Sequence, residues 1–180
     1  MNNNAASTEK DRKALLTGLF NDKETSEKAY YAAISRGYTN ADINLLMSDD
    51  TRKKYFSEGQ NSEFGSKALE GAGTGSAIGG TIGAVVGGIA AIGTNVFLPG
   101  LGLIVAGPLV AALAGLGAGG LAGGLVGALV GWGFPEDRAL AYEAGLKAGK
   151  IMVGVHPRSE EDASYFENEW RNNNGEEIYR

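Results

Sequence analysis

Glycine recurs at every fourth position in two segments of the chain, Gly71-Ala-Gly-Thr-Gly-Ser-Ala-Ile-Gly-Gly-Thr-Ile-Gly-Ala-Val-Val-Gly87 and Gly115-Leu-Gly-Ala-Gly-Gly-Leu-Ala-Gly-Gly-Leu-Val-Gly-Ala-Leu-Val-Gly131. Both segments lie within residues 71–135, which are 65 consecutive residues without a charged side chain. Glycine inside a helix costs about 1 kcal/mol relative to alanine, so a helix with five such positions needs a compensating gain. Small residues four apart leave a smooth groove into which another backbone packs closely. The segments therefore predict two helices that pack against each other, against copies of the chain, or both.

We call these two sets of glycines the first and second ladder. They are the candidate helix-packing and oligomerisation residues: Gly71, Gly75, Gly79, Gly83 and Gly87 in the first ladder, and Gly115, Gly119, Gly123, Gly127 and Gly131 in the second. They predict a helical hairpin over residues 71–134, with arms at about 66–93 and 105–132. Pro99-Gly100 marks the turn between the arms.

Composition narrows the classes of function. The chain has 180 residues, the length of one domain, and a net charge of −5. No basic stripe is present, and without clustered Lys and Arg to neutralise phosphates we expect no nucleic-acid partner. Cysteine is absent, which excludes disulfides, thiolate catalysis and cysteine-ligated metal. The polar N-terminus lacks the apolar stretch of a secretory signal.

Outside the hairpin, apolar runs alternate with amphipathic segments, and residues 49–70 are polar enough for a loop or a short helix. We expect strands at 14–20, 42–48 and 151–155, and helices at 22–36, 136–148 and 159–172. This order predicts an α+β fold, a ferredoxin-like βαβ…αβ sandwich interrupted by the long glycine-rich α-helical hairpin. The expected parts are a disordered tail at 1–13, the first half of the α+β domain at 14–70, the hairpin at 71–134, the second half with its C-terminal helix at 135–173, and a frayed tail at 174–180.

Two motifs carry a resemblance to a known family. They are Gly37-Tyr38-Thr39-Asn40-Ala41-Asp42-Ile43-Asn44-Leu45 and Pro135-Glu136-Asp137-Arg138-Ala139-Leu140-Ala141-Tyr142-Glu143-Ala144-Gly145-Leu146-Lys147-Ala148-Gly149. Over about 14–156 the chain resembles the bacterial general stress proteins (heat-induced stress protein, YflT-type domain), in a variant with a glycine-zipper insertion. The resemblance implies expression linked to stress and carries over no catalytic residue.

The sequence offers few candidates for chemistry. The stretch 115–120 matches the glycine spacing of a dinucleotide-binding loop but lies inside the expected second arm, not between a strand and a helix. The stretch 145–150 lacks the Ser or Thr of a phosphate-binding loop. His156 is the chain's one histidine, with neither a second His nor a Cys to complete a metal site or a nucleophilic triad. The acidic groups Asp49-Asp50 and Glu160-Glu161-Asp162 read as helix ends. We therefore expect no catalytic, cofactor-binding or metal residues, and no enzyme.

Aromatic side chains near the expected elements are more typical of a core or an interface than of a ligand site. They are Tyr30, Tyr31, Tyr142, Phe166 and Trp170.

The length of each arm allows the hairpin two locations. About 24 uncharged residues form a helix about 36 Å long, enough to cross a hydrocarbon core of about 30 Å. The leading hypothesis is a non-enzymatic stress-response protein that self-assembles through its ladders at or in the cytoplasmic membrane, with membrane lipid as a further partner. The alternative is a soluble structural homo-oligomer, a particle or filament in the cytoplasm, with the hairpins buried between subunits. No small-molecule ligand is indicated.

Overall fold

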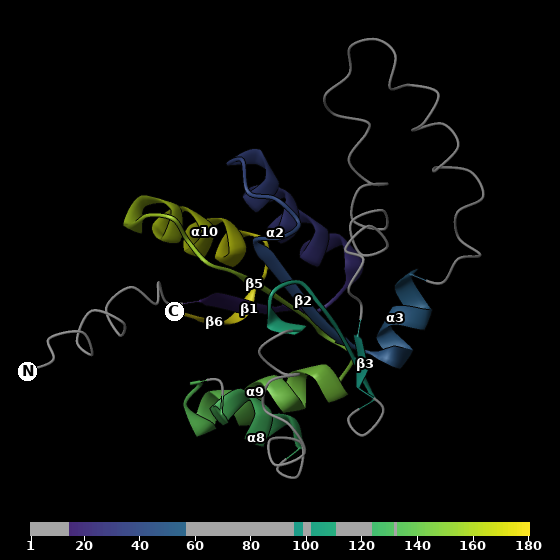
Figure 1. Ribbon diagram of the computed structural model, residues 1–180. Helices are drawn as coiled ribbons and strands as arrows, with labels where there is room; N and C mark the ends of the chain where they lie inside the picture. The colour runs from purple at the N-terminus through teal and green to yellow at the C-terminus, as the bar shows by residue number, and fades with distance from the viewer. Residues whose placement is uncertain (1–14, 57–95, 99–101, 111–123, 132) are drawn as a thin grey trace, which may run out of the picture.

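The computed structural model describes residues 15–56, 96–98, 102–110, 124–131 and 133–180 (Figure 1). In chain order the elements are β1 (Leu16–Phe20), α2 (Lys23–Ser35), β2 (Ile43–Ser48), α3 (Asp49–Phe56), β3 (Val96–Leu98), β4 (Leu103–Ala106), α8 (Gly124–Gly131), α9 (Glu136–Lys147), β5 (Ile151–Val155), α10 (Glu160–Asn172) and β6 (Glu176–Tyr179). The α+β class is confirmed, as are the three expected strands and three expected helices.

The six strands of the described residues form one sheet in the order β3-β4-β2-β5-β1-β6, and every pair of neighbours is antiparallel. β5 lies between β1 and β2, which makes those two strands parallel to each other with α2 as their crossover. The central position of β5 was expected from its unbroken apolar sequence, because a strand buried on both faces has no polar side to alternate with.

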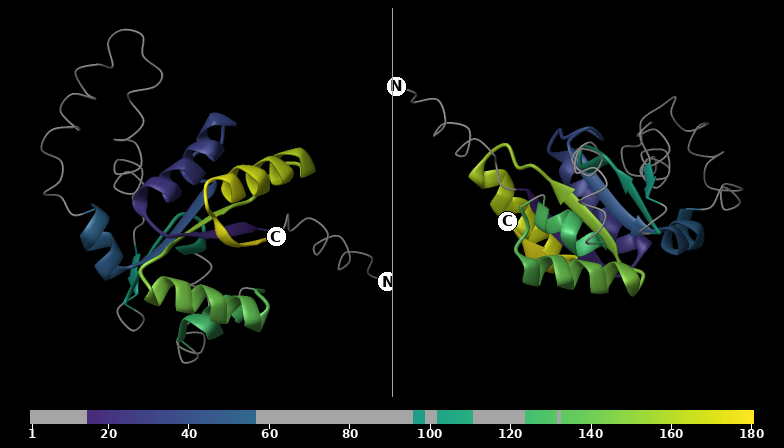
Figure 2. Two further views of the ribbon diagram at one scale, coloured as in Figure 1. Left: turned by 180° about the vertical axis from the view of Figure 1, so that it is seen from behind. Right: turned by 60° about the horizontal axis from the view of Figure 1, so that its bottom comes forward.

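Side chains alternate between the two faces of the sheet, as a period of two requires. Ile151, Val153 and Val155 of β5 belong to one core, and Met152 belongs to the other. The first core lies under α2 and α10, and the second lies under α8 and α9. Figures 1 and 2 show these two helix pairs on opposite faces of the sheet. Four of the five expected core aromatics are fully buried or nearly so, and Tyr31 packs partly buried against the first core.

Local capping explains where the outer helices begin and end. The Asp22 carboxylate accepts a hydrogen bond from the backbone N–H of Thr25 (2.8 Å) before α2. The Ser159 hydroxyl accepts one from the N–H of Asp162 (3.1 Å) before α10. After α2 the chain turns at Gly37, whose φ of 78° suits glycine.

The elements β1, α2, β2, β5, α10 and β6 follow the βαββαβ order of the expected ferredoxin-like sandwich, with their strands in the order β2-β5-β1-β6 and both helices over one face. The structure adds a second helix layer on the other face, which that arrangement leaves uncovered. Leu19, Leu46 and Met152 make the second face of the sheet apolar as well. Since an apolar face must be covered, α8 and α9 form a second helix layer. The second layer was not predicted, because the expectation treated the strands at 14–20, 42–48 and 151–155 as apolar runs. It did not ask which face of the sheet each residue takes.

The range expected to be hairpin, 71–134, also contributes strands to the sheet. β4 pairs with β2, from Leu45 opposite Ala106 to Ser48 opposite Leu103, and β3 pairs with β4. The strand sequence Leu103-Ile-Val-Ala contains no ladder glycine and is bounded by Gly102 and Gly107, which adopt φ of 63° and 92° and end the strand. The second arm therefore cannot begin at residue 105.

The C-terminal tail, expected to fray over 174–180, is an edge strand instead. Asn174, at φ 58°, and Gly175 turn the chain after α10, where the Gly175 N–H donates to the carbonyl oxygen of Trp170 (2.7 Å). β6 then pairs with β1, and Ile178 packs against the first core. The expected tail at 1–13 lies outside the described residues.

Candidate functional site

The second ladder enters the described structure in α8. Gly127 and Gly131 lie on this helix, and the helical state expected for them is confirmed. The other eight ladder glycines, and the stretch 115–120, lie outside the residues that the structure describes.

The buried face of α8 is not its ladder face. Leu125, Ala128 and Leu129 are buried in the second core, whereas Gly127 is half-buried and Gly131 is exposed. At 100° per residue the two glycines lie well away from Leu125 and Leu129 around the helix. The helix is thus held to the domain by one face and presents its ladder on another.

α9 anchors this layer to the sheet. The buried Tyr142 hydroxyl donates to the carbonyl oxygen of Glu177 (2.7 Å) and lies 2.6 Å from the Thr17 hydroxyl oxygen. Burial raises the pKa of Tyr142 to about 12. At Gly145, an added Cβ would lie 2.5 Å from a methyl carbon of Leu19, so the missing side chain lets α9 lie close to β1.

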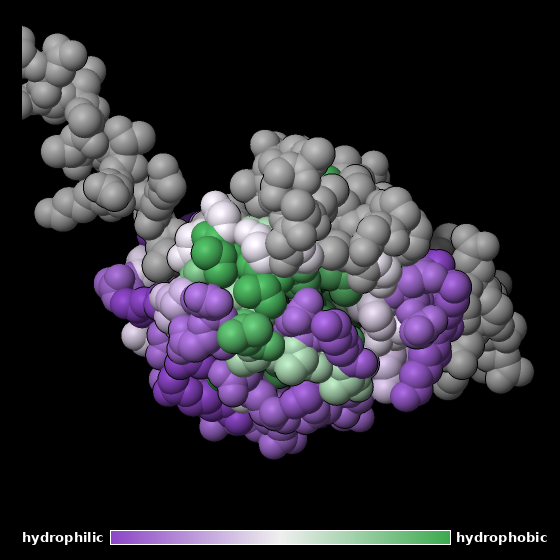
Figure 3. Space-filling model, turned by 90° about the horizontal axis from the view of Figure 1, so that it is seen from below, coloured by the Kyte–Doolittle hydropathy of each residue, from purple (hydrophilic) through white to green (hydrophobic). Residues whose placement is uncertain are grey.

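The outer surface of α8 and α9 carries apolar side chains. Val130 of α8 is 42% exposed and Leu140 of α9 is 52% exposed, and they are the two exposed large hydrophobic residues among those described. Figure 3, which views the molecule from the side of these two helices, shows hydrophobic residues gathered in the middle of this face, with hydrophilic residues below and to the sides of them. Such a surface is typical of an interaction site.

The start of the chain segment that leads toward the second ladder is fixed to the sheet. The backbone N–H of Leu109 donates to the Asn44 side-chain oxygen of β2 (2.6 Å), and both residues are fully buried. At Gly107 an added Cβ would lie 2.2 Å from the carbonyl oxygen of Ile43, so no other residue fits this turn. The turn at Gly107 and the hydrogen bond of Leu109 therefore fix the start of this segment against β2.

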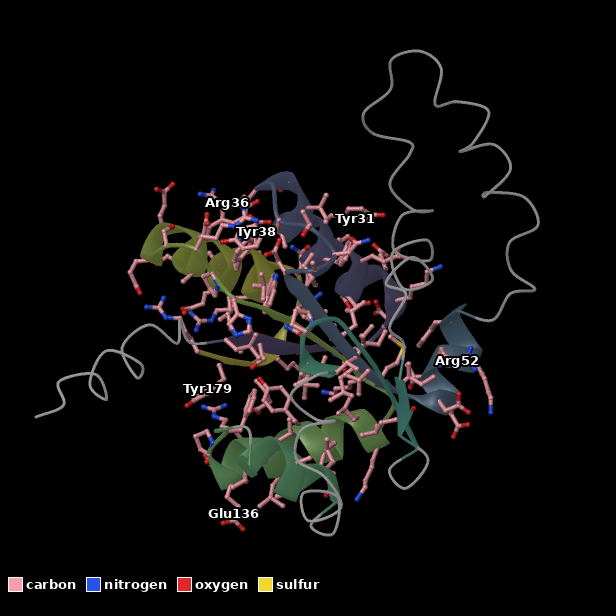
Figure 4. All side chains as sticks on the ribbon, in the orientation of Figure 1. Tyr31, Arg36, Tyr38, Arg52, Glu136 and Tyr179 are labelled. Carbon is pink, nitrogen blue, oxygen red and sulfur yellow. The ribbon has the colours of Figure 1, made fainter. Side chains whose placement is uncertain are left out.

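A polar network closes the opposite side of the molecule. The Tyr38 hydroxyl donates to the carboxylate of Asp162 (2.6 Å) and accepts from the backbone N–H of Arg158 (2.6 Å). Arg36 donates to the other oxygen of Asp162 (2.6 Å), and Figure 4 shows Arg36 and Tyr38 near each other between α2 and α10. The Tyr38 hydrogen bond and the Arg36 guanidinium hold the pKa of Asp162 below its usual value. These groups join the α2–β2 connection to the start of α10.

The remaining candidates from the sequence take structural positions. Residues 145–150 form the end of α9 and the turn into β5, with Gly149 at φ 90°. Asp49 begins α3 and pairs there with Lys53 (2.6 Å). In the described part of the chain, no group of three or more His, Asp or Glu side chains is arranged to hold a metal ion.

The exposed face of α9 was missed by sequence reasoning, although a signal was present. Within residues 136–148, Ala139, Tyr142 and Leu146 follow the spacing of one buried helix face. Leu140 falls outside that face, and an apolar residue out of phase with the core is the pattern that could have identified an interface.

No helix within the described ranges is both long and apolar enough to cross a bilayer. No protein-family model, curated protein or solved structure matches the chain. The resemblance to the general stress proteins therefore stays a prediction that rests on its two motifs.

Proposed function

We propose that this protein is a non-enzymatic scaffold that assembles with copies of itself through its glycine ladders. The observation that carries the proposal is the orientation of α8. Leu125 and Leu129 bind the helix to its own domain, while Gly127 is half-buried and Gly131 is exposed. Glycines outside the buried face of a helix leave room for the close backbone contact to which such spacing is suited.

Chain lengths favour an assembly with hairpins buried between subunits over a hairpin that crosses a bilayer. β4 and α8 both belong to the sheet domain, and the connection between them, residues 111–123, is shorter than the roughly 20 residues that one helical crossing needs. Residues 57–95 leave α3 and return to β3 in the same sheet, so they would have to cross twice, and two crossings need about 40 residues before any turn is added. The soluble homo-oligomer is therefore the form of assembly that we propose, with membrane lipid as the alternative partner.

A role in the stress response is part of the proposal and rests on the family resemblance. The motif residues have clear structural positions here: Tyr38 joins α2 to α10, and Tyr142 and Gly145 seat α9 on the sheet. A motif built from such positions is consistent with a scaffold, because its residues are occupied in holding elements together.

Oligomer mass tests the proposal. We expect the full chain in detergent-free buffer to be larger than a monomer by light scattering. Gly127→Leu together with Gly131→Leu should lower that mass, because two leucines push a packed backbone away. Gly127→Ala together with Gly131→Ala is the matched control and should keep the assembly, since alanine remains small.

Circular dichroism and urea unfolding test whether both variants fold. A monomeric wild-type protein, or an unchanged mass in the folded Leu variant, would overturn the proposal. Flotation with phosphatidylethanolamine and phosphatidylglycerol vesicles separates the alternative, because a membrane-bound chain floats with the lipid and resists a carbonate wash.

A further inference from the structure

The outer face of α9 has a centre that is apolar or small and ends of opposite charge. Glu136, Asp137, Leu140, Ala144 and Lys147 are all exposed. Their spacing of three or four places them along one side of the helix. Figure 4 shows Glu136 at the start of α9, pointing away from the sheet.

The outer face of one α9 is complementary to the outer face of a second α9 that runs in the opposite direction. If a second α9 lies antiparallel across a two-fold axis midway between Leu140 and Ala144, Leu140 of each copy faces Ala144 of the other. The same register sets Asp137 opposite Lys147 at both ends. Because of the two-fold axis, each contact occurs twice. The interface therefore has an opposite-charge contact at each end and two apolar contacts in its centre.

The acidic end of α9 is free for such a contact. Within the described residues neither Glu136 nor Asp137 takes part in an ion pair. α10 also begins with acidic residues, but there Glu160 pairs with Arg180, and Glu161 pairs with Arg36 (3.1 Å). Lys147 pairs with Glu143 of its own helix (3.3 Å), and because Lys147 is exposed it can turn to another partner.

We infer that α9 pairs with α9 of a second copy in this antiparallel register. The contact is separate from the ladder contact, and it deepens the proposed function by giving each subunit a second interface. Two different interfaces in one subunit link copies into an extended or closed array and not into a single dimer.

The test is a charge exchange in the full-length chain that carries Gly127→Leu and Gly131→Leu, so that the ladder contact is removed. This parent should be a dimer by native mass spectrometry at low salt. Glu136→Lys with Asp137→Lys should weaken dimerisation about tenfold or more, because like charges then face each other at both ends. Lys147→Glu should act in the same direction for the same reason.

Mixing the two charge variants should restore the dimer as a heterodimer, since the lysine introduced at position 137 of one chain would then face the glutamate introduced at position 147 of the other. Asp50→Lys with Glu24→Lys, at exposed positions on α3 and α2, matches the change in net charge and should leave the dimer intact. The inference is overturned if the folded parent is a monomer, which is the result expected if another part of the same chain covers α9. It is also overturned if the mixture of the two charge variants stays monomeric. The same charge variants are also made in the wild-type chain, which keeps its ladder glycines. If α9 pairing is lost there, the remaining oligomer mass is that of the assembly through the ladders alone, so the two proposals can be told apart.

Discussion

The two faces of the sheet are closed in different ways. On the face of α2 and α10, the core is aromatic and the polar groups pair with one another, as Tyr38, Arg36 and Asp162 do. On the face of α8 and α9, the helices leave Val130 and Leu140 exposed and present glycine outward. On the first face Tyr38, Arg36 and Asp162 pair within one chain, whereas the second face offers apolar area that another chain can cover. We therefore expect the first face to contribute most to stability and the second face to carry the proposed assembly.

If that division holds, the largest change in stability without a change in assembly should come from the first face. Trp170 is fully buried, donates from its ring N–H to the Ala29 carbonyl oxygen (3.2 Å), and packs edge-on against Phe20. Trp170→Ala should lower the free energy of unfolding by about 3–5 kcal/mol, measured by urea denaturation. Trp170→Phe is the control and should cost less. A loss of oligomer mass in the folded Ala variant would show that the two faces are not independent.

Much of the first face could be predicted from the sequence, because its signals are local. Asp22 and Ser159 precede helices as caps, and Gly37 follows one. β4 could not be predicted in the same way, because it depends on pairing between Leu45 and Ala106, which are far apart in the chain. The same holds for β6, whose Glu-Glu-Ile-Tyr sequence is too short and charged to predict a strand without its neighbour β1.

The candidate site was predicted only in part for the same reason. The spacing of Gly127 and Gly131 indicated helix packing from sequence alone, but which side of α8 faces the core is decided by its contact with α9. The exposure of Leu140 likewise depends on how α9 is seated by Tyr142 and Gly145.

A smaller effect is expected where the second layer is attached to the sheet. Tyr142→Phe removes the hydroxyl that donates to the Glu177 carbonyl oxygen and contacts Thr17. Leaving these buried partners unsatisfied should cost about 1–3 kcal/mol in urea denaturation. Since the pKa of Tyr142 is raised to about 12, the neutral form is favoured in the folded state, and its contribution should be present below pH of about 10 and fall as pH rises toward about 12.

The wild-type protein should therefore lose stability at alkaline pH more steeply than Tyr142→Phe. Parallel profiles for the two proteins would contradict this assignment. Leu146→Val, at a fully buried position of α9 that carries no titratable group, is the control and should lower stability without changing the alkaline slope of the wild type.

The smallest effect on the free energy of unfolding is expected in the polar network on the first face. Its dependence on pH distinguishes a contribution of charge from one of packing. The pKa of Asp162 is lowered, first by the Tyr38 hydrogen bond and then by Arg36. A lowered carboxyl pKa contributes stability above the unfolded value of about 3.9, and that stability is lost as pH falls through the folded pKa. Asp162→Asn should cost about 1 kcal/mol or less at pH of about 7, and the difference from wild type should shrink at acid pH, as the carboxylate of the folded protein becomes protonated. Glu161→Gln, whose carboxylate is 84% exposed, should show almost no difference at either pH. If Asp162→Asn costs the same at both pH values, the side chain acts through packing or capping, and the first face is not held closed by charge.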